Sequence, residues 1–239
     1  MLKIQELTTG FNQNRKIHVL HENISLEILP GNIMLLLGAN GIGKSVFLKT
    51  ILNIIRSISG NVIFNQQTLN QLEANKLAEY ISLMLPNPPS IELMTCLEVV
   101  LSGQQRFLNP WILSQEKETK HAIQYFEKCK ILHLIHKNFA QLSDGEKQKV
   151  MLARCLAQET PIILLDEPMA FLDYPSRKHF LSLIKEIAET QQKIILVSTH
   201  DIEISLPFAS NILAFSKNKW QFFVNPSDFH PNLIFDETT

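Results

Sequence analysis

The sequence lacks the features that mark secreted, zinc-stabilised or nucleic-acid-binding proteins. Its 239 residues include three cysteines, which are scattered and form no CxxC pair, so neither a disulfide framework nor a zinc site is expected. The net charge is −1, which provides no basic field for a nucleic acid. A reducing setting is the simplest interpretation of this cysteine usage.

Long hydrophobic runs are also missing. The apolar runs at Ile33–Leu37 and Ile194–Val197 are far shorter than the roughly 18–20 residues that a membrane-spanning helix needs. Residues 1–7 alternate like a strand and do not have the layout of a signal peptide. If the protein works at a membrane, another subunit must therefore cross it. The length and the 45% apolar composition suit one globular domain with a substantial core.

Strands alternate with helices along most of the chain, which predicts an α/β fold with a mainly parallel, covered sheet. The expected strands are Leu2–Leu7, Ile24–Ile28, Ile33–Leu37, Asn61–Phe64, Tyr80–Leu85, Ile162–Leu165, Lys193–Ser198, Ile212–Phe215 and Gln221–Val224. The expected helices are Val46–Ile55, Thr95–Gly103, Ser114–His136, Asp144–Gln158, Ser176–Thr190 and Ile202–Phe208. Prolines at 86, 88 and 89 mark a boundary, and we interpret residues 86–140 as a helical insertion.

A glycine-rich segment after the apolar run Ile33–Leu37 has the spacing G-x-x-x-x-G-K-[ST] of a phosphate-binding loop. Its backbone N–H groups and the following helix N-terminus can hold phosphate oxygens. Lys44 can reach the outer phosphates of a nucleotide, and the Ser45 hydroxyl can bind Mg²⁺. A turn without a ligand is the alternative, which the strand-to-helix context disfavours. The expected nucleotide contacts are Gly38, Ala39, Asn40, Gly41, Ile42, Gly43, Lys44, Ser45 and Val46.

Two carboxylates follow the apolar run Ile162–Leu165, where ligands of open parallel sheets bind. Asp166 is placed to hold Mg²⁺, and Glu167 to orient or deprotonate a water molecule. His200 follows another core strand at the same edge, which makes a contact with the γ-phosphate plausible. An acidic turn and a solvated histidine are the plainer alternatives, and the phosphate-binding loop upstream favours the functional interpretation.

A helix start is predicted at residues 142–146. Ser143 is a good N-cap, and Glu146 three residues later completes a capping box. A capped helix start is also an anion site, so the structural and the functional interpretation are compatible.

Taken together, these residues resemble the ATP-binding cassette (ABC) ATPases. The phosphate-binding loop, the Walker-B run Ile162–Glu167, the signature Leu142–Glu146, the D-loop Ala170–Asp173 and the switch histidine His200 occur in the family's order over about residues 2–220. The resemblance implies a P-loop NTPase (RecA-like) α/β core with an antiparallel β-subdomain and an inserted helical subdomain. The expected single domain comprises a core at 1–85 and 141–225, a helical subdomain at 86–140 and a tail at 226–239.

The resemblance also implies roles for single residues. Two cassettes of this family dimerise head to tail, so Ser143 and Gly145 would contact the γ-phosphate of the partner's ATP, and Asp173 would link the two sites. Glu167, His200 and Lys44 would be the catalytic residues, with Ser45 and Asp166 at Mg²⁺. Phe11 would stack on adenine, although a core phenylalanine is the alternative.

Two departures from the family pattern stand out. The signature carries Asp144 and Glu146 where the family usually has glycine and glutamine, which places two negative charges near a triphosphate unless they point away or meet Lys147 and Lys149. Pro86 stands where the Q-loop glutamine is expected, and Asn87 is the nearest amide. The residue that relays the nucleotide state to a membrane partner is therefore left open.

We expect an ATP-hydrolysing subunit that works at the cytoplasmic face of the cell membrane with a second ABC ATPase subunit, in a homodimer, and with multi-span permease subunits. Segments 101–107 and 171–175 resemble those of importers of metal chelates such as ferric siderophore, haem or cobalamin. The docking candidates Phe107, Pro110 and Trp111 could equally form a small core within the insertion. A soluble ABC ATPase, for example of the iron–sulfur assembly type, and a binding-only regulatory cassette are the alternatives.

Overall fold

A six-stranded sheet forms the centre of the fold in the computed structural model, which describes residues 1–13, 16–107, 115–217 and 219–232. Its strand order is β10 (Lys219–Phe223), β9 (Asn211–Ser216), β3 (Ile33–Leu37), β8 (Ile194–Ser198), β7 (Ile162–Asp166) and β6 (Ile81–Met84). All pairs are parallel except β9 with β10. Every residue of β3, β7 and β8 is buried, as the continuous apolar runs predict for a parallel sheet covered on both faces.

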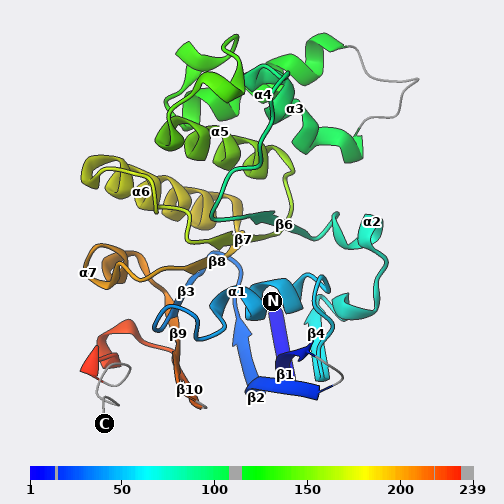
Figure 1. Cartoon of the computed structure of the whole chain (residues 1–239), viewed down its shortest axis with the longest axis vertical. Helices are drawn as coiled ribbons and strands as arrows, with labels where there is room; N and C mark the ends of the chain where they lie inside the picture. Colours follow the sequence, from blue (N-terminus) through cyan, green and yellow to red (C-terminus); the bar gives the residue numbers. More distant parts are fainter. Residues whose placement is uncertain (14–15, 108–114, 218, 233–239) are drawn as a thin grey trace.

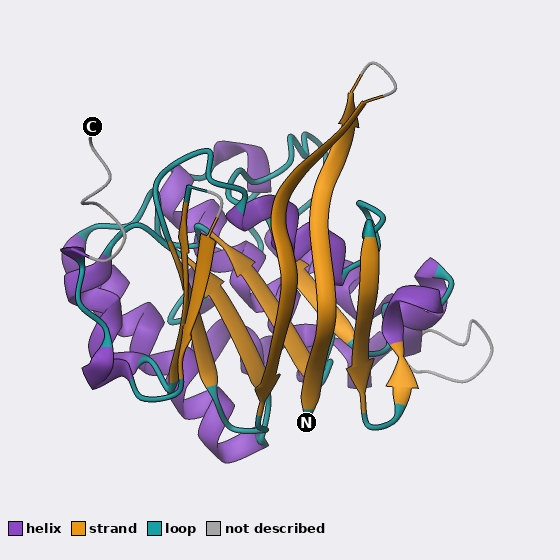
Figure 2. Cartoon of the chain, turned by 90° about the horizontal axis from the view of Figure 1, so that it is seen from below, coloured by secondary structure: helices purple, strands orange, loops and turns teal. Residues whose placement is uncertain are grey.

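A second, antiparallel sheet has the order β2 (Lys16–Ile28), β1 (Leu2–Gln13), β4 (Ser59–Phe64) and β5 (Gln67–Thr68). The expectation of an antiparallel β-subdomain is confirmed. The first two strands are longer than the sequence predicts, and Figure 2 shows their hairpin reaching past the other strands. The first four residues of β2, Lys16–Val19, are exposed, so no pattern of buried apolar side chains marks this part of the strand in the sequence.

Helix α1 (Lys44–Ile51) lies between the two sheets (Figure 1). Its side chains Phe47, Leu48 and Ile51 join one buried cluster that contains residues of both sheets. The helix ends four residues before the predicted Ile55, because Asn53 adopts a left-handed conformation (φ 53°). The N–H of Ile54 then donates to the Lys49 carbonyl over 3.0 Å, which closes the helix end.

The opposite face of the six-stranded sheet is covered by further helices. These are α3 (Cys96–Leu101), α4 (Gln115–Lys128), α5 (Asp144–Ala157), α6 (Tyr174–Gln191) and α7 (Ile202–Ser205). Figure 1 shows α3, α4 and α5 gathered at one end of the molecule and α6 between them and the sheet. Buried residues of α3, α4, α5 and α6 form one cluster with the side chains on this face of the sheet. The short helix α2 (Ala74–Leu77) precedes β6.

The helix predicted over residues 114–136 is also wrong in length. The segment expected to be helical from 114 to 136 contains α4, which ends at Lys128, and a separate 3₁₀ turn at Leu132–Leu134. Lys130 is left-handed (φ 56°), and the N–H of Ile131 donates to the Phe126 carbonyl over 2.9 Å. This is a Schellman end, in which buried Phe126 and Ile131 supply the accompanying apolar pair. The other 3₁₀ turns are Leu69–Gln71, Ser102–Phe107, Phe139–Gln141, Leu206–Phe208 and Pro226–Asp228.

Candidate nucleotide site

The glycine-rich loop runs from the buried end of β3 into α1, as its sequence context predicts. Gly43 is the N-cap of α1 and has φ 108°, a conformation that favours glycine. The cap makes no side-chain hydrogen bond, so the start of α1 leaves backbone N–H groups directed at the loop. Such an arrangement favours an anion, because the helix N-terminus also carries positive partial charge.

Lys44 is buried against this loop. Its Nζ donates to the Gly38 carbonyl over 2.8 Å and to the Ala39 carbonyl over 3.3 Å, and it lies 3.5 Å from Glu167 Oε1. The ammonium is therefore held between the loop and the end of β7. This ammonium is a positive charge next to the loop, of the kind that forms strong hydrogen bonds with phosphate oxygens.

The two carboxylates after Ile162–Leu165 are held by Ser198, which pairs with Asp166 across strands β7 and β8. The Ser198 hydroxyl donates to Asp166 Oδ1 over 2.6 Å and accepts from the Glu167 N–H over 2.9 Å. Asp166 is almost fully buried, whereas Glu167 is partly exposed. Glu167 also has φ 45°, which is unusual for a residue other than glycine and typical of strained functional positions.

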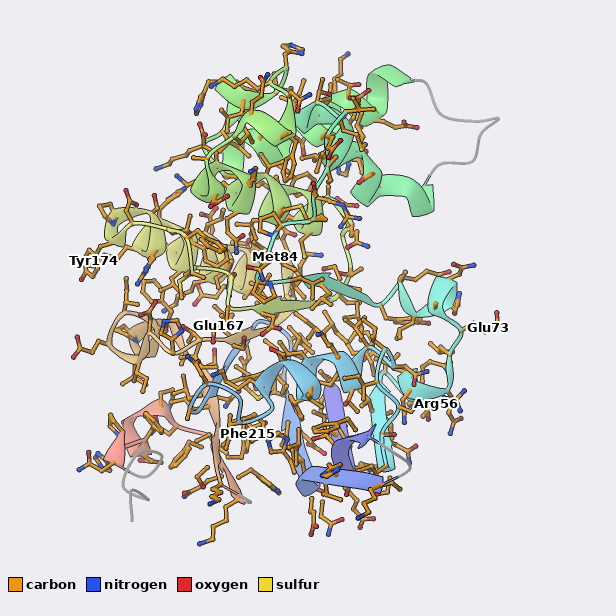
Figure 3. The ribbon with its side chains drawn as sticks, in the orientation of Figure 1. Arg56, Glu73, Met84, Glu167, Tyr174 and Phe215 are labelled. Atoms are coloured by element: carbon orange, nitrogen blue, oxygen red, sulfur yellow. The ribbon has the colours of Figure 1, made fainter. Side chains whose placement is uncertain are left out.

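His200 lies at the same edge and completes a row of three charged or titratable side chains. Its Nδ1 is 2.8 Å from Glu167 Oε2, so the Glu167 carboxylate bridges Lys44 and His200. Figure 3 shows Glu167 facing the loop that opens α1. The structure thus brings together the three residues that the sequence nominates for catalysis, while their roles remain predictions.

The signature segment forms the start of α5, and Ser143 caps this helix. Its hydroxyl accepts from the Glu146 N–H over 3.3 Å, and both its hydroxyl and its own N–H donate to Glu146 Oε2, over 2.8 and 2.9 Å. The hydrogen bond from the backbone of Ser143 is the main cause of the lowered pKa of Glu146. Asp144 meets Lys147 over 3.6 Å. One of the two acids thus meets one of the lysines, whereas the other, Glu146, turns back onto Ser143.

A close contact joins the signature helix to the segment after β7. Gln148 is buried, and its amide donates to the Pro168 carbonyl over 3.0 Å. Gly145 approaches the D-loop so closely that a Cβ there would lie 3.1 Å from the Phe171 carbonyl oxygen. Helix α5 therefore packs against the segment that follows the C-terminal end of β7.

Asp173 is the N-cap of α6 and accepts from the Ser176 N–H over 2.9 Å. The side chain of Ser176, and then this backbone hydrogen bond, lower the pKa of the Asp173 carboxyl. Among the described residues, neither Ser143 nor Asp173 forms a hydrogen bond with loop 38–45. These two residues are thus outside the part of the site that this single chain assembles around Lys44.

The remaining expected contacts lie on β1 and in the first turn of α1. Phe11, on β1, is partly exposed and stacks on His18 with ring centres 5.4 Å apart, so the alternative of a core phenylalanine is wrong. Ser45 and Val46 begin α1 and are half-buried. Pro86 follows β6, whose Met84 pairs with Leu165, so Pro86 comes next to the carboxylate end of β7.

His21 is a residue of the loop's surroundings that none of the sequence motifs reveals. It is buried beneath the loop and contacts the Ile42 carbonyl. Among the described residues, no helix combines the length and the apolar composition that a membrane span requires.

Comparison with known proteins gives consistent matches. A family model described as ABC transporter matches residues 21–170. The hemin import ATP-binding protein HmuV of Shewanella denitrificans is 34% identical over 225 residues, which cover 92% of this chain and 85% of that protein.

Two solved structures extend this likeness over nearly the whole chain. The ATP-binding cassette MJ0796, a dimer in a post-hydrolysis state with ADP and phosphate, superposes with a TM-score of 0.83 at 26% identity, covering 94% of this chain and 99% of that one. An ABC transporter assigned to the metal-chelate type, in an inward-facing conformation, gives a TM-score of 0.82 at 25% identity, covering 98% of this chain and 88% of that one.

Proposed function

Since the chain belongs to the ABC transporter family and is one of its ATPases, we propose that loop 38–45 binds ATP and that Glu167 activates the water that attacks the γ-phosphate. The observation that carries this proposal is the position of Glu167, 3.5 Å from Lys44 Nζ and 2.8 Å from His200 Nδ1. A carboxylate between a phosphate-binding lysine and an imidazole is placed to accept a proton close to a bound triphosphate.

The residues around the loop also fit Mg²⁺. Ser45 supplies a hydroxyl and Asp166 a carboxylate, and Mg²⁺ prefers oxygen ligands of these kinds. The buried Asp166 keeps one carboxylate oxygen bonded to Ser198, which fixes its orientation. When bound, the cation neutralises charge that develops on the phosphates.

The chain's own residues then divide the reaction. Lys44 holds the outer phosphates, and loop N–H groups, including that of Gly43, hold the others. The water oxygen bonds to the γ-phosphorus while the bond from that phosphorus to the bridging oxygen of ADP breaks. Glu167 takes the proton from the water, and His200 supports the carboxylate and contacts the γ-phosphate.

We further propose that two copies complete each site. Ser143 and Gly145 of one copy would contact the γ-phosphate bound to the other copy, and Asp173 would couple the two sites. The similar cassette MJ0796 forms a dimer, which supports this arrangement. The absence of contacts from Ser143 or Asp173 to loop 38–45, among the described residues, fits a role toward a partner.

The variant Glu167→Gln tests the catalytic proposal. The amide keeps the shape of the carboxylate but cannot accept the water proton, so ATP turnover should fall by about a hundredfold or more. ATP binding, measured by calorimetry, should persist, and the ATP-bound dimer should accumulate. A variant that hydrolyses ATP at the native rate would exclude Glu167 as the base. Lys44→Ala is the matched control, which should lose ATP binding itself.

For the transported solute we propose a metal chelate such as ferric siderophore, haem or cobalamin, carried inward. The hemin import protein HmuV and the metal-chelate type transporter are similar to this chain, which supports the proposal. We place the subunit on the cytoplasmic face of the cell membrane, with multi-span permease subunits as partners. Uptake of radiolabelled haem, ferric siderophore and cobalamin by vesicles that contain the permease would identify the solute, and ATP-dependent uptake of none of them would exclude the class.

The division of the chain is also a proposal, with a nucleotide-binding core at 1–85 and 141–225, a helical subdomain at 86–140 that docks the permease, and a tail at 226–239. The docking candidates Pro110 and Trp111 and the side chain of Phe107 lie outside the described residues. Trp111→Ala should weaken association with the permease while leaving ATPase activity intact. Unfolding of this variant would favour a core role for Trp111.

A further inference from the structure

A buried histidine supports the phosphate-binding loop from below. His21, on β2, has Nδ1 2.8 Å from Thr9 Oγ1 on β1 and Nε2 3.0 Å from the Ile42 carbonyl oxygen. His21 and Thr9 are almost fully buried, so the hydrogen bond between them is shielded from water, and the bond to Ile42 is partly buried. The imidazole thus joins the antiparallel sheet directly to the loop.

The acceptors around the ring fix its tautomer. The Ile42 carbonyl can only accept a hydrogen bond, so Nε2 must carry the proton and donate it. A neutral ring then has a lone pair on Nδ1, which accepts from the Thr9 hydroxyl. Burial lowers the pKa of His21 to about 4, so the ring is neutral near pH 7. Thr9 therefore stabilises the tautomer that donates to the loop.

This hydrogen bond also orients a backbone donor of the loop. The Ile42 carbonyl and the Gly43 N–H belong to one planar, trans peptide, so they point in opposite directions. Fixing the carbonyl toward His21 turns the Gly43 N–H to the other side, which is the side of the loop that faces a phosphate. The backbone alone does not fix the orientation of this peptide, because Gly43 has φ 108° and glycine adopts many conformations.

Packing holds the ring at this position. Its centre lies 4.1 Å from the ring of Phe215 on β9, which Figure 3 places beneath the loop. A Cβ at Gly43 would be 2.7 Å from His21 Cε1, so loop and ring are already in close contact. Phe215 in turn packs against Phe47 of α1, with ring centres 5.6 Å apart. The ring is therefore held directly by Phe215 of β9 and by the loop, and α1 supports Phe215 in turn.

We propose that His21 is a positioning residue of the nucleotide site, which presents the Gly43 N–H to a phosphate of the nucleotide through its hydrogen bond to the Ile42 carbonyl, with Thr9 setting its tautomer. This inference rests on the proposed binding of ATP by loop 38–45 and goes beyond it. His21 does not touch the nucleotide itself.

Two substitutions of similar polarity separate positioning from packing. The amide nitrogen of glutamine can occupy the place of Nε2, whereas the shorter asparagine reaches only the place of Nδ1. In a Glu167→Gln background, which prevents turnover, His21→Asn should raise the Kd for ATP at least fivefold by calorimetry. His21→Gln should stay within about twofold of the parent, because it can still donate to Ile42.

A spectroscopic measurement reports on the peptide itself. The amide resonance of Gly43 should shift strongly when ATP is added to the parent and to His21→Gln, and weakly in His21→Asn. A purely structural histidine would change the melting temperature of both variants without separating their Kd values. Equal Kd values for the two variants, whether native or weakened, would overturn the proposal.

Thr9 provides a second pair if His21→Asn does not fold. Thr9→Val removes the hydroxyl that holds the tautomer and should weaken ATP binding about threefold, while Thr9→Ser retains it and should bind within twofold of the parent. Native binding by Thr9→Val would then overturn the proposal. Lys44→Ala separates a failure of the positioning role of His21 from a failure of the proposed ATP site. If Lys44→Ala still binds ATP, the role of loop 38–45 itself is refuted. Loss in Lys44→Ala together with native binding in His21→Asn would refute only the positioning role.

Discussion

Acidification should destabilise this protein through the buried imidazole of His21. Burial lowers the pKa of His21 from its ordinary 6.5 to about 4 in the folded chain. Between these two pH values the unfolded chain binds a proton at His21 and the folded chain does not. The free energy of unfolding is therefore highest above pH 6.5 and falls as the pH drops. The difference corresponds to about 3 kcal/mol below pH 4, and about 2 kcal/mol is already lost at pH 5.

His21→Gln is the reference for this measurement, because glutamine does not titrate and every other titratable group is shared. Denaturant unfolding at pH 8 and pH 5 should show the native chain losing about 2 kcal/mol more than the variant. In thermal unfolding, the same loss corresponds to an extra decrease of roughly 4–8 °C in Tm for a chain of this size. A proton NMR titration of the His21 ring should give a midpoint near 4.

Two results would refute this reasoning. If native chain and variant lose equal stability between pH 8 and pH 5, His21 does not carry the acid sensitivity. If the ring titrates near 6.5 in the folded chain, its burial has no electrostatic cost. Either result would also remove burial as the reason why the imidazole beneath the loop stays neutral.

Two substitutions probe the charges and hydrogen bonds around the site. Glu146→Gln keeps an acceptor for the capping box with Ser143 but removes a negative charge from the start of α5. The Kd of the ATP-dependent dimer, measured by sedimentation, should therefore fall about threefold to fivefold. A higher Kd of this dimer would contradict the prediction. Ser198→Ala removes the hydrogen bonds to Asp166 and Glu167, so steady-state assays should show kcat at least tenfold lower with the Kd for ATP changed less than threefold. A native kcat would mean that Ser198 does not position the carboxylates.

The centre of the fold follows from local sequence. The run Ile33–Leu37 is a buried strand with the predicted ends, and Ile162–Leu165 differs by one residue, because continuous apolar runs bounded by turns have few other solutions in a covered sheet. The loop between β3 and α1 follows from its glycines and its lysine. The ends of helices were less predictable, since Asn53 and Lys130 stop α1 and α4 with left-handed conformations that their residue types permit but do not dictate.

The position of His21 could not be predicted from periodicity. Every second residue of the inner part of β2 faces the core, namely Ile24, Leu26 and Ile28. If this alternation continued, Glu22 would face the core as well. Instead Asn23 is left-handed (φ 53°), and the β1–β2 register shifts between Leu7 and Thr9. This irregularity changes which face the following residues occupy, so His21 points inward beneath the loop.

The contacts of Lys44 would connect nucleotide binding to the state of the Glu167 carboxylate, which we propose as the base. Its ammonium has three N–H donors, and it has three acceptors nearby, the carbonyls of Gly38 and Ala39 and the carboxylate of Glu167. A phosphate must therefore replace at least one of them. The contact with Glu167, at 3.5 Å, is the longest of the three, and the two carbonyls belong to the loop that carries the phosphate. Binding of the triphosphate would accordingly release Glu167 from Lys44 while leaving its 2.8 Å contact with His200, so that the carboxylate becomes free to accept a proton when its substrate is in place.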